Sequence, residues 1–450
     1  MPLKSVLLRR IMYPMQQFIK AESFSGILLI LVTVVALAWA NSPWAASYEE
    51  TWNTPLTLAF GDFGLTKAAI LWINDGLMAI FFFVVGLEIK REMLMGELAS
   101  LKKAAFPVVA AVGGMLVPAL IYAFLNSNTP GIDGWGIPMA TDIAFALGIL
   151  TLLGNRVPLS LKLFLVAFAI VDDIGAVLVI AIFYTAELNV TLLLSALGVF
   201  GVLMVMGTVL KSHRMWLYIL LGIVMWVLFL KSGVHATVAG ILLAITIPAR
   251  SKISEKEFVL STNQIMEEMQ SVYAPLPGED QNLENLEESQ YQSAVYSIEE
   301  NCEEALPPLH RLEHTLHPWV AYAIMPIFAL ANAGIFIDSS LTSGFSNPVT
   351  WGIVLGLVLG KPVGIMLFTW LASATGLVSK PDSFTWVQVA GAGLLGGIGF
   401  TMSIFIANLA FTGSPLLAQA KFAILCASLV AGVVAYLLLR STSKVIATEV

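Results

Sequence analysis

Long runs of hydrophobic residues recur along the whole chain, and short polar stretches separate them. A helix needs about 20 apolar residues to cross the hydrocarbon core of a bilayer, and most of the runs are close to that length or longer. The runs lack the polar and apolar alternation of a transmembrane β-barrel. The pattern predicts twelve membrane-spanning helices, at residues 24–41, 67–88, 104–125, 137–153, 158–184, 190–209, 215–230, 233–249, 317–337, 350–373, 385–411 and 417–439.

The composition supports this interpretation. The 450 residues are 58% hydrophobic and only 12% charged, and the mean hydropathy of +0.85 excludes an ordinary soluble globular protein. The two cysteines, Cys302 and Cys426, support neither a disulfide framework nor a thiolate metal site. We therefore expect an all-α polytopic membrane protein.

Basic residues concentrate in alternate loops. If both termini lie in the cytoplasm, the loops on the opposite side hold little positive charge beyond Lys67 and Lys231. The positive-inside rule favours this orientation, which also requires an even number of helices. We predict, in chain order, an N-terminal cytoplasmic interfacial segment (1–23, with an uncleaved signal anchor as the alternative), transmembrane helices 1–8 (24–249), an acidic cytoplasmic loop (250–316), transmembrane helices 9–12 (317–440) and a cytoplasmic tail (441–450).

The acidic loop dominates the net charge of −7. Residues 251–308 hold thirteen acidic residues against Lys252 and Lys256, and without them the chain would be slightly basic. The polar composition predicts a mostly disordered insert with a short helix near residues 255–270. A solvated tether is favoured over a regulatory docking element.

Two adjacent acids, Asp172 and Asp173, lie in the middle of the apolar segment 158–184. A charged side chain at the bilayer centre costs about 2.5–3.5 kcal/mol on insertion scales, and two neighbouring carboxylates also repel each other. Spanning the membrane requires neither acid, so the pair is a candidate ion or proton site. Because successive side chains on a helix point about 100° apart, the two acids should have different partners.

Lys361 lies near the middle of the segment 350–373, too deep for its ammonium group to reach water easily. Its predicted partner is a buried carboxylate. The alternative is a fixed salt bridge that only holds two helices together. Lys162 and Lys421 also lie in apolar segments, but snorkelling or a neighbouring contact accounts for both.

Two spans have features that interrupt a helix. Thr141 and Asp142, in the short segment 137–153, offer hard oxygen ligands that suit a small alkali cation. The five glycines of residues 391–403 favour an unwound stretch, with close helix packing as the alternative. Since these segments belong to two separate triplets of helices, they indicate a transporter with inverted-topology repeats and two discontinuous helices.

Several motifs resemble the NhaA family of bacterial sodium-proton antiporters. The similarity is carried by WINDGLMAIFFFVVGLEIKRE (72–92), ATDIAFALGIL (140–150), AIVDDIGAVLVIAIFYT (169–185), LKSGVHATVAG (230–240), RLEHTLHPWVAY (311–322), FALANAG (328–334), LGKPVGI (359–365) and GIGFTMSIFIANLAF (397–411). The resemblance implies an electrogenic, pH-regulated exchange of cytoplasmic Na⁺ or Li⁺ for external protons in the bacterial inner membrane. It implies a transporter rather than an enzyme, with no cofactor.

The resemblance also implies roles for individual residues. Asp173 would be the favoured cation ligand, and Asp172 would pair with Lys361, so that Na⁺ binds at the two acids. Thr141 and Asp142 would lie where the two broken helices cross and balance the charges of the helix ends. The candidates for a pH response are Glu88, Arg91, Glu92, Glu313, His314 and His317, for which ordinary surface charge pairing is an equal alternative.

The remaining expectations concern packing and partners. His235 is expected to have a hydrogen-bonded packing role and Asp75 a structural one. The expected partners are membrane lipid and a second copy of the chain, bound through a hairpin in segment 42–66 that turns at Gly61 and Asp62, whereas nucleic acid is not expected. The acidic loop is longer than the resemblance leads us to expect, so its role cannot be transferred.

Two other classes of protein fit less well. Paired aspartates could activate water in an intramembrane protease, but those enzymes carry their acids on separate helices within motifs that this chain lacks. A passive cation channel would place acidic rings in a symmetric pore, and the buried Lys361 argues against that.

Overall fold

The computed structural model describes residues 24–60, 63–185, 188–272, 284–337 and 347–442. The predicted interfacial segment 1–23 and nearly all of the tail 441–450 lie outside the described residues. Within the described residues, eight helices are long and apolar enough to cross a membrane, and two bent helix pairs raise that number to ten. The prediction of an all-α polytopic membrane protein is confirmed, while the count of twelve helices and the inverted repeat stay predictions.

The first half of the chain begins with helix Phe24–Ala40. It continues with α2 (Ala45–Asn53), β1 (Pro55–Phe60), β2 (Phe63–Ala68), α3 (Ala69–Trp72), the π-helix η1 (Ile73–Leu77), α4 (Met78–Met95), α5 (Leu101–Asn126), the 3₁₀-helix η2 (Ile132–Met139), α6 (Ile143–Leu152), the 3₁₀-turn η3 (Gly154–Arg156), α7 (Leu159–Phe183), α8 (Val190–Thr208) and α9 (Met215–Ser232).

The second half contains the remaining helices. They are α10 (Thr237–Thr246), α11 (Glu255–Val272), α12 (Glu284–Ala305), α13 (Pro308–Trp319), the π-helix η4 (Val320–Ile324), α14 (Met325–Asn332), α16 (Pro348–Leu355), the π-helix η6 (Gly356–Gly360), α17 (Lys361–Ala374), α18 (Trp386–Gly396), α19 (Phe400–Ala410) and α20 (Leu416–Thr442).

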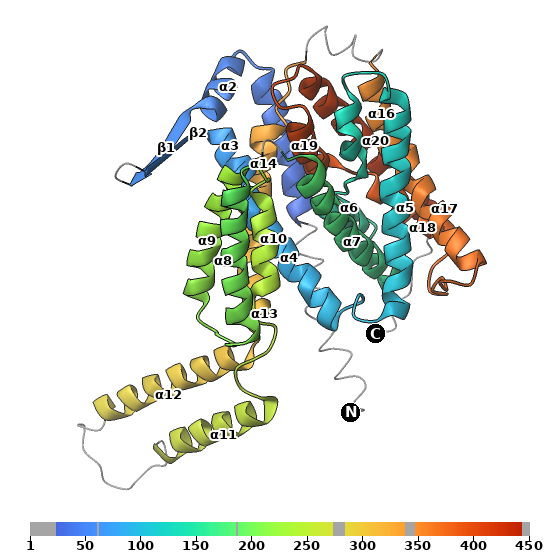
Figure 1. Ribbon diagram of the computed structural model, residues 1–450. Helices are drawn as coiled ribbons and strands as arrows, with labels where there is room; N and C mark the ends of the chain where they lie inside the picture. The colour runs from blue at the N-terminus through green and yellow to red at the C-terminus, as the bar shows by residue number, and fades with distance from the viewer. Residues whose placement is uncertain (1–23, 61–62, 186–187, 273–283, 338–346, 443–450) are drawn as a thin grey trace.

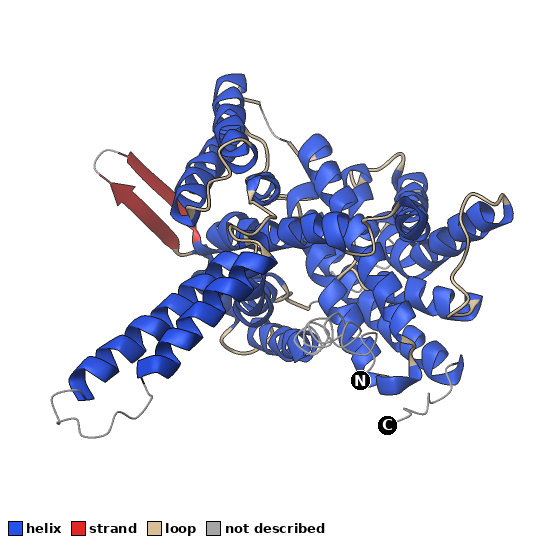
Figure 2. Cartoon of the chain, turned by 90° about the horizontal axis from the view of Figure 1, so that it is seen from below, coloured by secondary structure: helices blue, strands red, loops and turns tan. Residues whose placement is uncertain are grey.

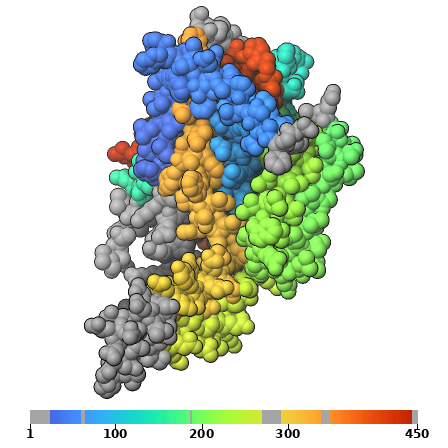
Figure 3. All heavy atoms as spheres, turned by 90° about the vertical axis from the view of Figure 1, so that its left-hand side faces the viewer, coloured from blue at the N-terminus to red at the C-terminus, as the bar shows by residue number. Residues whose placement is uncertain are grey.

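The helices form two groups that lie side by side in Figure 1. The first bundle consists of α2–α4, α8–α10, α13 and α14, and the second bundle consists of α5–α7 and α16–α20. Helices within a bundle pack extensively, whereas α4 with α7 and α14 with α19 make smaller contacts between the bundles. Figure 3 shows α13 and α14 on the surface between the α2–α4 segment and the helices α8 and α9.

Small residues bring the helices of the second bundle close together. A Cβ atom at Gly364 of α17 would collide with the backbone carbonyl of Gly113 on α5, so only glycine permits this approach. A Cβ atom at Gly360, just before α17, would lie 3.0 Å from Cα of Pro118 on α5, which is also a tight approach. This packing holds the start of α17, and with it Lys361, inside the bundle.

The predicted span 233–249 differs from the helix observed there. Gly233 adopts a left-handed conformation with φ of 89°, and helix α10 begins only at Thr237. It ends at Thr246, shortly before Pro248, which cannot continue the hydrogen-bonding pattern. The apolar run therefore contains a turn as well as a short helix.

Two elements project from the same side of the helix bundles, as Figures 1 and 2 show. One is the antiparallel hairpin of β1 and β2, with a register from Pro55 opposite Ala68 to Phe60 opposite Phe63. It confirms the predicted hairpin, although its turn at 61–62 lies outside the described residues. The other is the pair α11 and α12, which we call the arm. We refer to the two ends of the molecule as the hairpin end and the arm end.

The arm corrects the expectation of a mostly disordered acidic loop. The helix expected near 255–270 is present as α11, but the second helix, α12, was not expected. Its residues Glu284–Ala305 are rich in Glu, which is a good helix former, and α12 packs against α11. Ion pairs of Lys252 with Glu304 and of Arg311 with Glu303 (2.8 Å) connect the end of α12 to the flanking segments.

Candidate ion site

The paired acids lie on an unbroken part of α7, deep inside the protein. Asp172 is 1% exposed and Asp173 is 4% exposed. Lys361 at the start of α17 is fully buried, and its Nζ lies 2.7 Å from Oδ2 of Asp172. The same ammonium group donates a hydrogen bond to the carbonyl of Met139 at the end of η2. The structure thus joins Asp172 to Lys361 and leaves Asp173 on a different face of the helix.

Two interrupted helices cross beside these acids. Residues 140–142 are not helical between η2 and α6, and α18 and α19 are bent by 46° at residues 397–399. The backbone N–H of Asp142 donates to the carbonyl of Ile398 (2.6 Å), and the hydroxyl of Thr141 donates to the carbonyl of Gly396 (2.9 Å). Each interruption thereby supplies hydrogen-bond partners for the backbone of the other, as a membrane interior requires.

Asp142 caps the N-termini of two helices at once. Its Oδ1 accepts a hydrogen bond from the N–H of Phe145 in α6 (3.1 Å). Its Oδ2 accepts one from the N–H of Thr401 in α19 (3.0 Å) and another from the Thr401 hydroxyl. Helix N-termini carry partial positive charge, so a single carboxylate stabilises both.

Thr401 was not recognised in the sequence. The available signal was a hydroxyl residue directly after the glycine-rich stretch, at the point where a helix could restart. Recognising it required knowing which acid lies opposite, because Asp142 is far away in the sequence.

The glycines of residues 391–403 serve both of the functions considered for them. Gly397 lies in the break, where a Cβ atom would collide with the carbonyl of Leu357. Gly393 and Gly396 instead lie within α18 and pack against Pro362 and Phe168. The stretch therefore interrupts one helix and also brings α18 close to the helices that carry the site.

Negative charge exceeds positive charge around Asp173. Its electrostatic neighbours are the carboxylates of Asp172, Glu88 and Asp142 and the ammonium group of Lys361. Thr141 approaches the Asp172 carboxylate, yet Oδ1 of Asp172 has no hydrogen bond of good geometry among the described residues. Buried carboxylate oxygens with spare acceptor capacity suit a proton or a small alkali cation.

Comparisons with known proteins agree with this geometry. Residues 16–439 match the sequence profile of the family described as "Na+/H+ antiporter 1". The chain is 51% identical to the Na(+)/H(+) antiporter NhaA of Oleidesulfovibrio alaskensis over 431 residues, which cover 96% of this chain and 94% of that protein. The chain belongs to the NhaA family. It is also 47% identical over 432 residues to the Helicobacter pylori protein of the same description, with 96% of each chain covered.

This NhaA-family chain has a second charged cluster near the arm end, between α4 and α13. Arg91 donates to Oε1 of Glu313 (2.6 Å) and to Oε1 of Glu92 (2.9 Å). Glu88 and His317 are also buried, whereas His314 is exposed. The structure thus brings the α4 and α13 candidates for a pH response together, although His314 points to solvent, and the pair between Arg91 and Glu313 is not an ordinary surface contact.

Burial shifts the pKa values of two side chains of α13. It raises the pKa of Glu313, opposed by the nearby charges of Arg91 and His317. It lowers the pKa of His310, and the positive charge of Arg91 acts in the same direction. His310 was not among the sequence candidates, although it lies one turn before Glu313 on the same helix face.

We expect replacement of Glu313 by Gln to change the pH dependence of stability. A raised folded-state pKa stabilises the protein below the unfolded value of about 4.3, and this contribution disappears as the pH rises through the folded-state pKa. The wild type should therefore lose thermal stability relative to Glu313→Gln on going from about pH 4 to about pH 8, a range that includes both carboxyl and histidine titrations. Glu49→Gln, at an exposed acid of α2, is the matched control, and parallel stability curves for wild type and Glu313→Gln would contradict the expectation.

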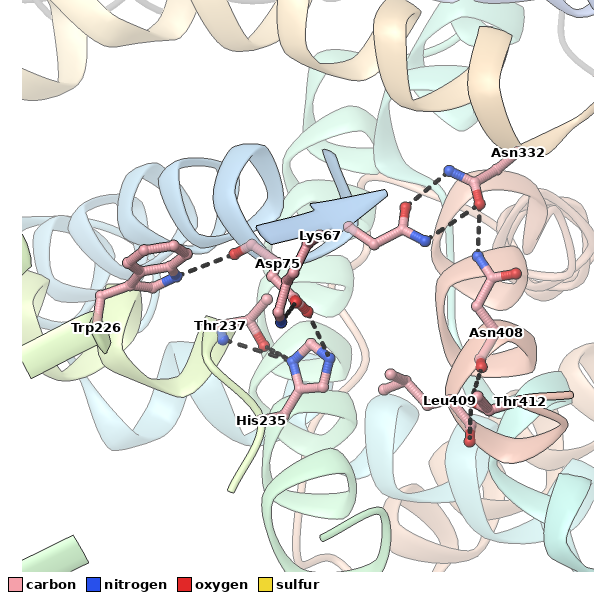
Figure 4. A network of polar contacts seen from close by, with 10 residues as sticks. Lys67, Asp75, Trp226, His235, Thr237, Asn332, Asn408, Leu409 and Thr412 are labelled. Atoms are coloured by element: carbon pink, nitrogen blue, oxygen red, sulfur yellow. Dashed lines mark hydrogen bonds and ion pairs between the residues drawn. The ribbon is translucent and has the colours of Figure 1, made fainter. Parts of the chain in front are cut away.

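Asp75 and His235 lie in a separate network nearer the hairpin end (Figure 4). Oδ2 of Asp75 lies 2.7 Å from Nζ of Lys67, and Oδ1 lies 3.8 Å from Nε2 of His235. Nδ1 of His235 contacts the hydroxyl of Thr237 (2.8 Å), and Trp226 donates to the Asp75 carbonyl (3.1 Å). These contacts link η1 of this NhaA-family chain to the segment before α10 and to the end of β2.

Proposed function

We propose that this chain exchanges cytoplasmic Na⁺ or Li⁺ for external protons. The observation that supports it best is the buried pair of unlike acids, Asp172 joined to Lys361 and Asp173 free of that bond, in a chain of the NhaA family. Members of this family are secondary transporters rather than enzymes, and the ions are substrates, so no cofactor is expected. Transport that moves more than one proton per sodium ion would be electrogenic.

Sodium ions and protons compete for one site, and this competition couples their transport. A cation bound at Asp173 and Asp172 requires ionised carboxylates, and protons on the same oxygens exclude the cation. When the site faces the cytoplasm, sodium displaces the protons, and when it faces outward, protons displace sodium. A rigid-body movement of one bundle relative to the other would change which side the site faces.

The distribution of charge favours one orientation in the bacterial inner membrane. Many of the described basic residues lie in loops or helix ends at the arm end, among them Lys102, Arg156 and Lys380. By the positive-inside rule the arm end and both termini would be cytoplasmic, and the hairpin end would be external. The candidates for a pH response between α4 and α13 would then meet cytoplasmic pH.

Sodium-dependent pH change in everted vesicles tests the proposed exchange. Vesicles containing the wild type should lose an imposed pH gradient when Na⁺ or Li⁺ is added, and vesicles without the protein should keep it. A membrane-potential dye should report net charge movement in the same vesicles. The proposal fails if the gradient does not respond to either ion.

We also propose that two copies of the chain associate through segment 42–66. In support, the hairpin of β1 and β2 projects away from the helices, and its residues Leu56 and Leu58 are 49% and 69% exposed. An unpaired strand edge with exposed apolar side chains is suited to pairing with a second strand. The mass of the purified protein in detergent, with and without residues 55–68, distinguishes dimer from monomer.

The arm is expected to influence regulation little. Its two helices pack on each other and are joined at their base to Lys252 and to Arg311 of α13, which is consistent with a tether. Deletion of residues 255–304 should therefore leave the exchange rate and its pH profile close to those of the wild type in the vesicle assay. A displaced pH profile would show instead that the acidic arm takes part in pH regulation.

A further inference from the structure

One face of α19 connects the ion site to the hairpin end. Thr401, Phe405 and Asn408 are spaced four and three residues apart, so they lie on the same side of the helix. Thr401 touches Asp142 at the crossing of the broken helices. Asn408 lies seven residues further, about 10 Å along the helix axis. Beyond Thr401, this face meets the first bundle.

The middle of this face forms an aromatic contact between the bundles. Phe405 is fully buried, and its ring centre lies 5.6 Å from that of Phe82 on α4 and 6.2 Å from that of Phe328 on α14. The ring of His235 lies edge-on at 5.3 Å. These three partners belong to the first bundle, so Phe405 fills the space directly beyond the ion site.

A row of amide side chains crosses the same boundary nearer the hairpin end (Figure 4). Nδ2 of Asn408 donates to Oδ1 of Asn332 at the end of α14 (2.7 Å). Asn332 and Asn74 of η1 exchange hydrogen bonds of 2.8 and 3.4 Å. Asn74 and Asn332 belong to the first bundle, and Asn408 belongs to the second. Within this row of amides, the bond from Asn408 therefore joins the two bundles.

The central amide uses all of its hydrogen-bonding capacity. Asn332 is fully buried, its Nδ2 donates to Asn74 and to the carbonyl of Phe328, and its Oδ1 accepts from Asn74 and Asn408. If the bundles separate here, the bond from Asn408 breaks while the other three remain within the first bundle. The network is therefore divided at one defined bond.

The first bundle holds Asn332 firmly from the hairpin side. Tyr48 of α2 donates to the carbonyl of Leu330 (2.8 Å) and accepts from the N–H of Gly334 (3.1 Å). Asn41 donates to the carbonyl of Ile335 (2.8 Å). The end of α14 is thus fixed, and movement of α19 is what can separate Asn408 from Asn332.

We propose that the hydrogen bond from Asn408 to Asn332 holds the two bundles together on the hairpin side of the ion site, and we call this bond the latch. It sets the balance between the inward-facing and outward-facing states of the site. This inference rests on the proposed exchange, in which the site must open to each side in turn. Asn408 is then a positioning residue, since it contacts neither the ion nor the acids. Loss of one neutral hydrogen bond should shift the two-state ratio about two- to tenfold toward the state that is open at the hairpin end.

A distance measurement tests the latch without depending on transport. Spin labels are attached to exposed positions of α2 and α20, on either side of the boundary, in a background without native cysteines: Glu50→Cys and Ala418→Cys with Cys302→Ser and Cys426→Ser. Double electron–electron resonance then gives the distribution of distances between the labels. Asn408→Ala should increase the population of longer distances at the hairpin end.

Asn126→Ala is the matched control. Nδ2 of Asn126 donates to the carbonyls of Tyr122 and Pro348, so both bonds lie within the second bundle and their loss should leave the distance distribution unchanged. Asn408 is only half-buried, so its truncation should leave the fold intact, which a thermal melt would verify. A distribution for folded Asn408→Ala that matches the wild type overturns the latch, whereas absence of sodium-dependent exchange in the wild type would overturn the proposed function instead.

Discussion

Vesicles containing Asp173→Asn are expected to keep an imposed pH gradient when sodium or lithium is added. Asparagine is nearly the same size as aspartate, but it neither ionises nor offers an anionic oxygen to a cation. Asp173 is 4% exposed and Lys361 pairs with Asp172, so the ion pair does not require the charge of Asp173. We expect complete loss of exchange with the protein still folded.

Asp133→Asn provides the matched control, since Asp133 is an exposed acid of η2 and undergoes the same chemical change. It should support exchange at the wild-type rate. Normal sodium-dependent dissipation by Asp173→Asn, in membranes that contain equal amounts of protein, would remove Asp173 from the site. Isothermal titration of the purified variants with Li⁺ separates lost binding from lost movement.

Lys361→Ala should both destabilise the protein and change the pH profile of exchange. The side chains of Lys361 and Asp172 are fully buried, and removing one partner of a buried ion pair costs about 3–5 kcal/mol because the remaining charge is unpaired. The carbonyl of Met139 also loses its donor. A thermal melt in detergent measures the first effect, and vesicle assays over a range of pH measure the second.

A second substitution distinguishes the effect of an unpaired charge from the effect of lost side-chain packing. Lys361→Ala combined with Asp172→Asn removes the unpaired charge and should restore part of the lost stability, while exchange remains altered. Lys162→Ala is the control, because the Lys162 ammonium group contacts the carbonyl of Gly154 near the arm end. If Lys361→Ala has wild-type stability and an unchanged pH profile, the pairing with Asp172 has no role in transport.

Most of the site residues that could be identified from the sequence are charged residues, because burying a charge in an apolar segment costs free energy. Asp172, Asp173 and Lys361 were recognised because charge inside an apolar segment requires a reason, and helix geometry alone implied that the two acids differ. The apolar runs likewise located most of the helices. What they could not locate was the residue at which α10 begins, because Val234 and Ala236 continue the apolar run past the turn at Gly233.

Neutral polar residues and long-range partners could not be predicted in this way. Thr401 and Asn408 are unremarkable within an apolar helix, and each acquires its importance from a partner more than seventy residues away, Asp142 or Asn332. Helix α12 was missed for a different reason. Its charge suggested disorder, but its many Glu residues also favour a helix, and α11 packs alongside it.

The arm also has a practical consequence for imaging. A 48.5 kDa membrane protein has most of its mass inside a detergent micelle, which gives electron cryomicroscopy few features by which to align particles. Helices α11 and α12 extend beyond the bundles as a hydrophilic rod, tied at its base by Lys252 and Arg311. An antibody fragment or a fused domain bound to that rod would act as a fiducial marker far from the ion site and from the latch.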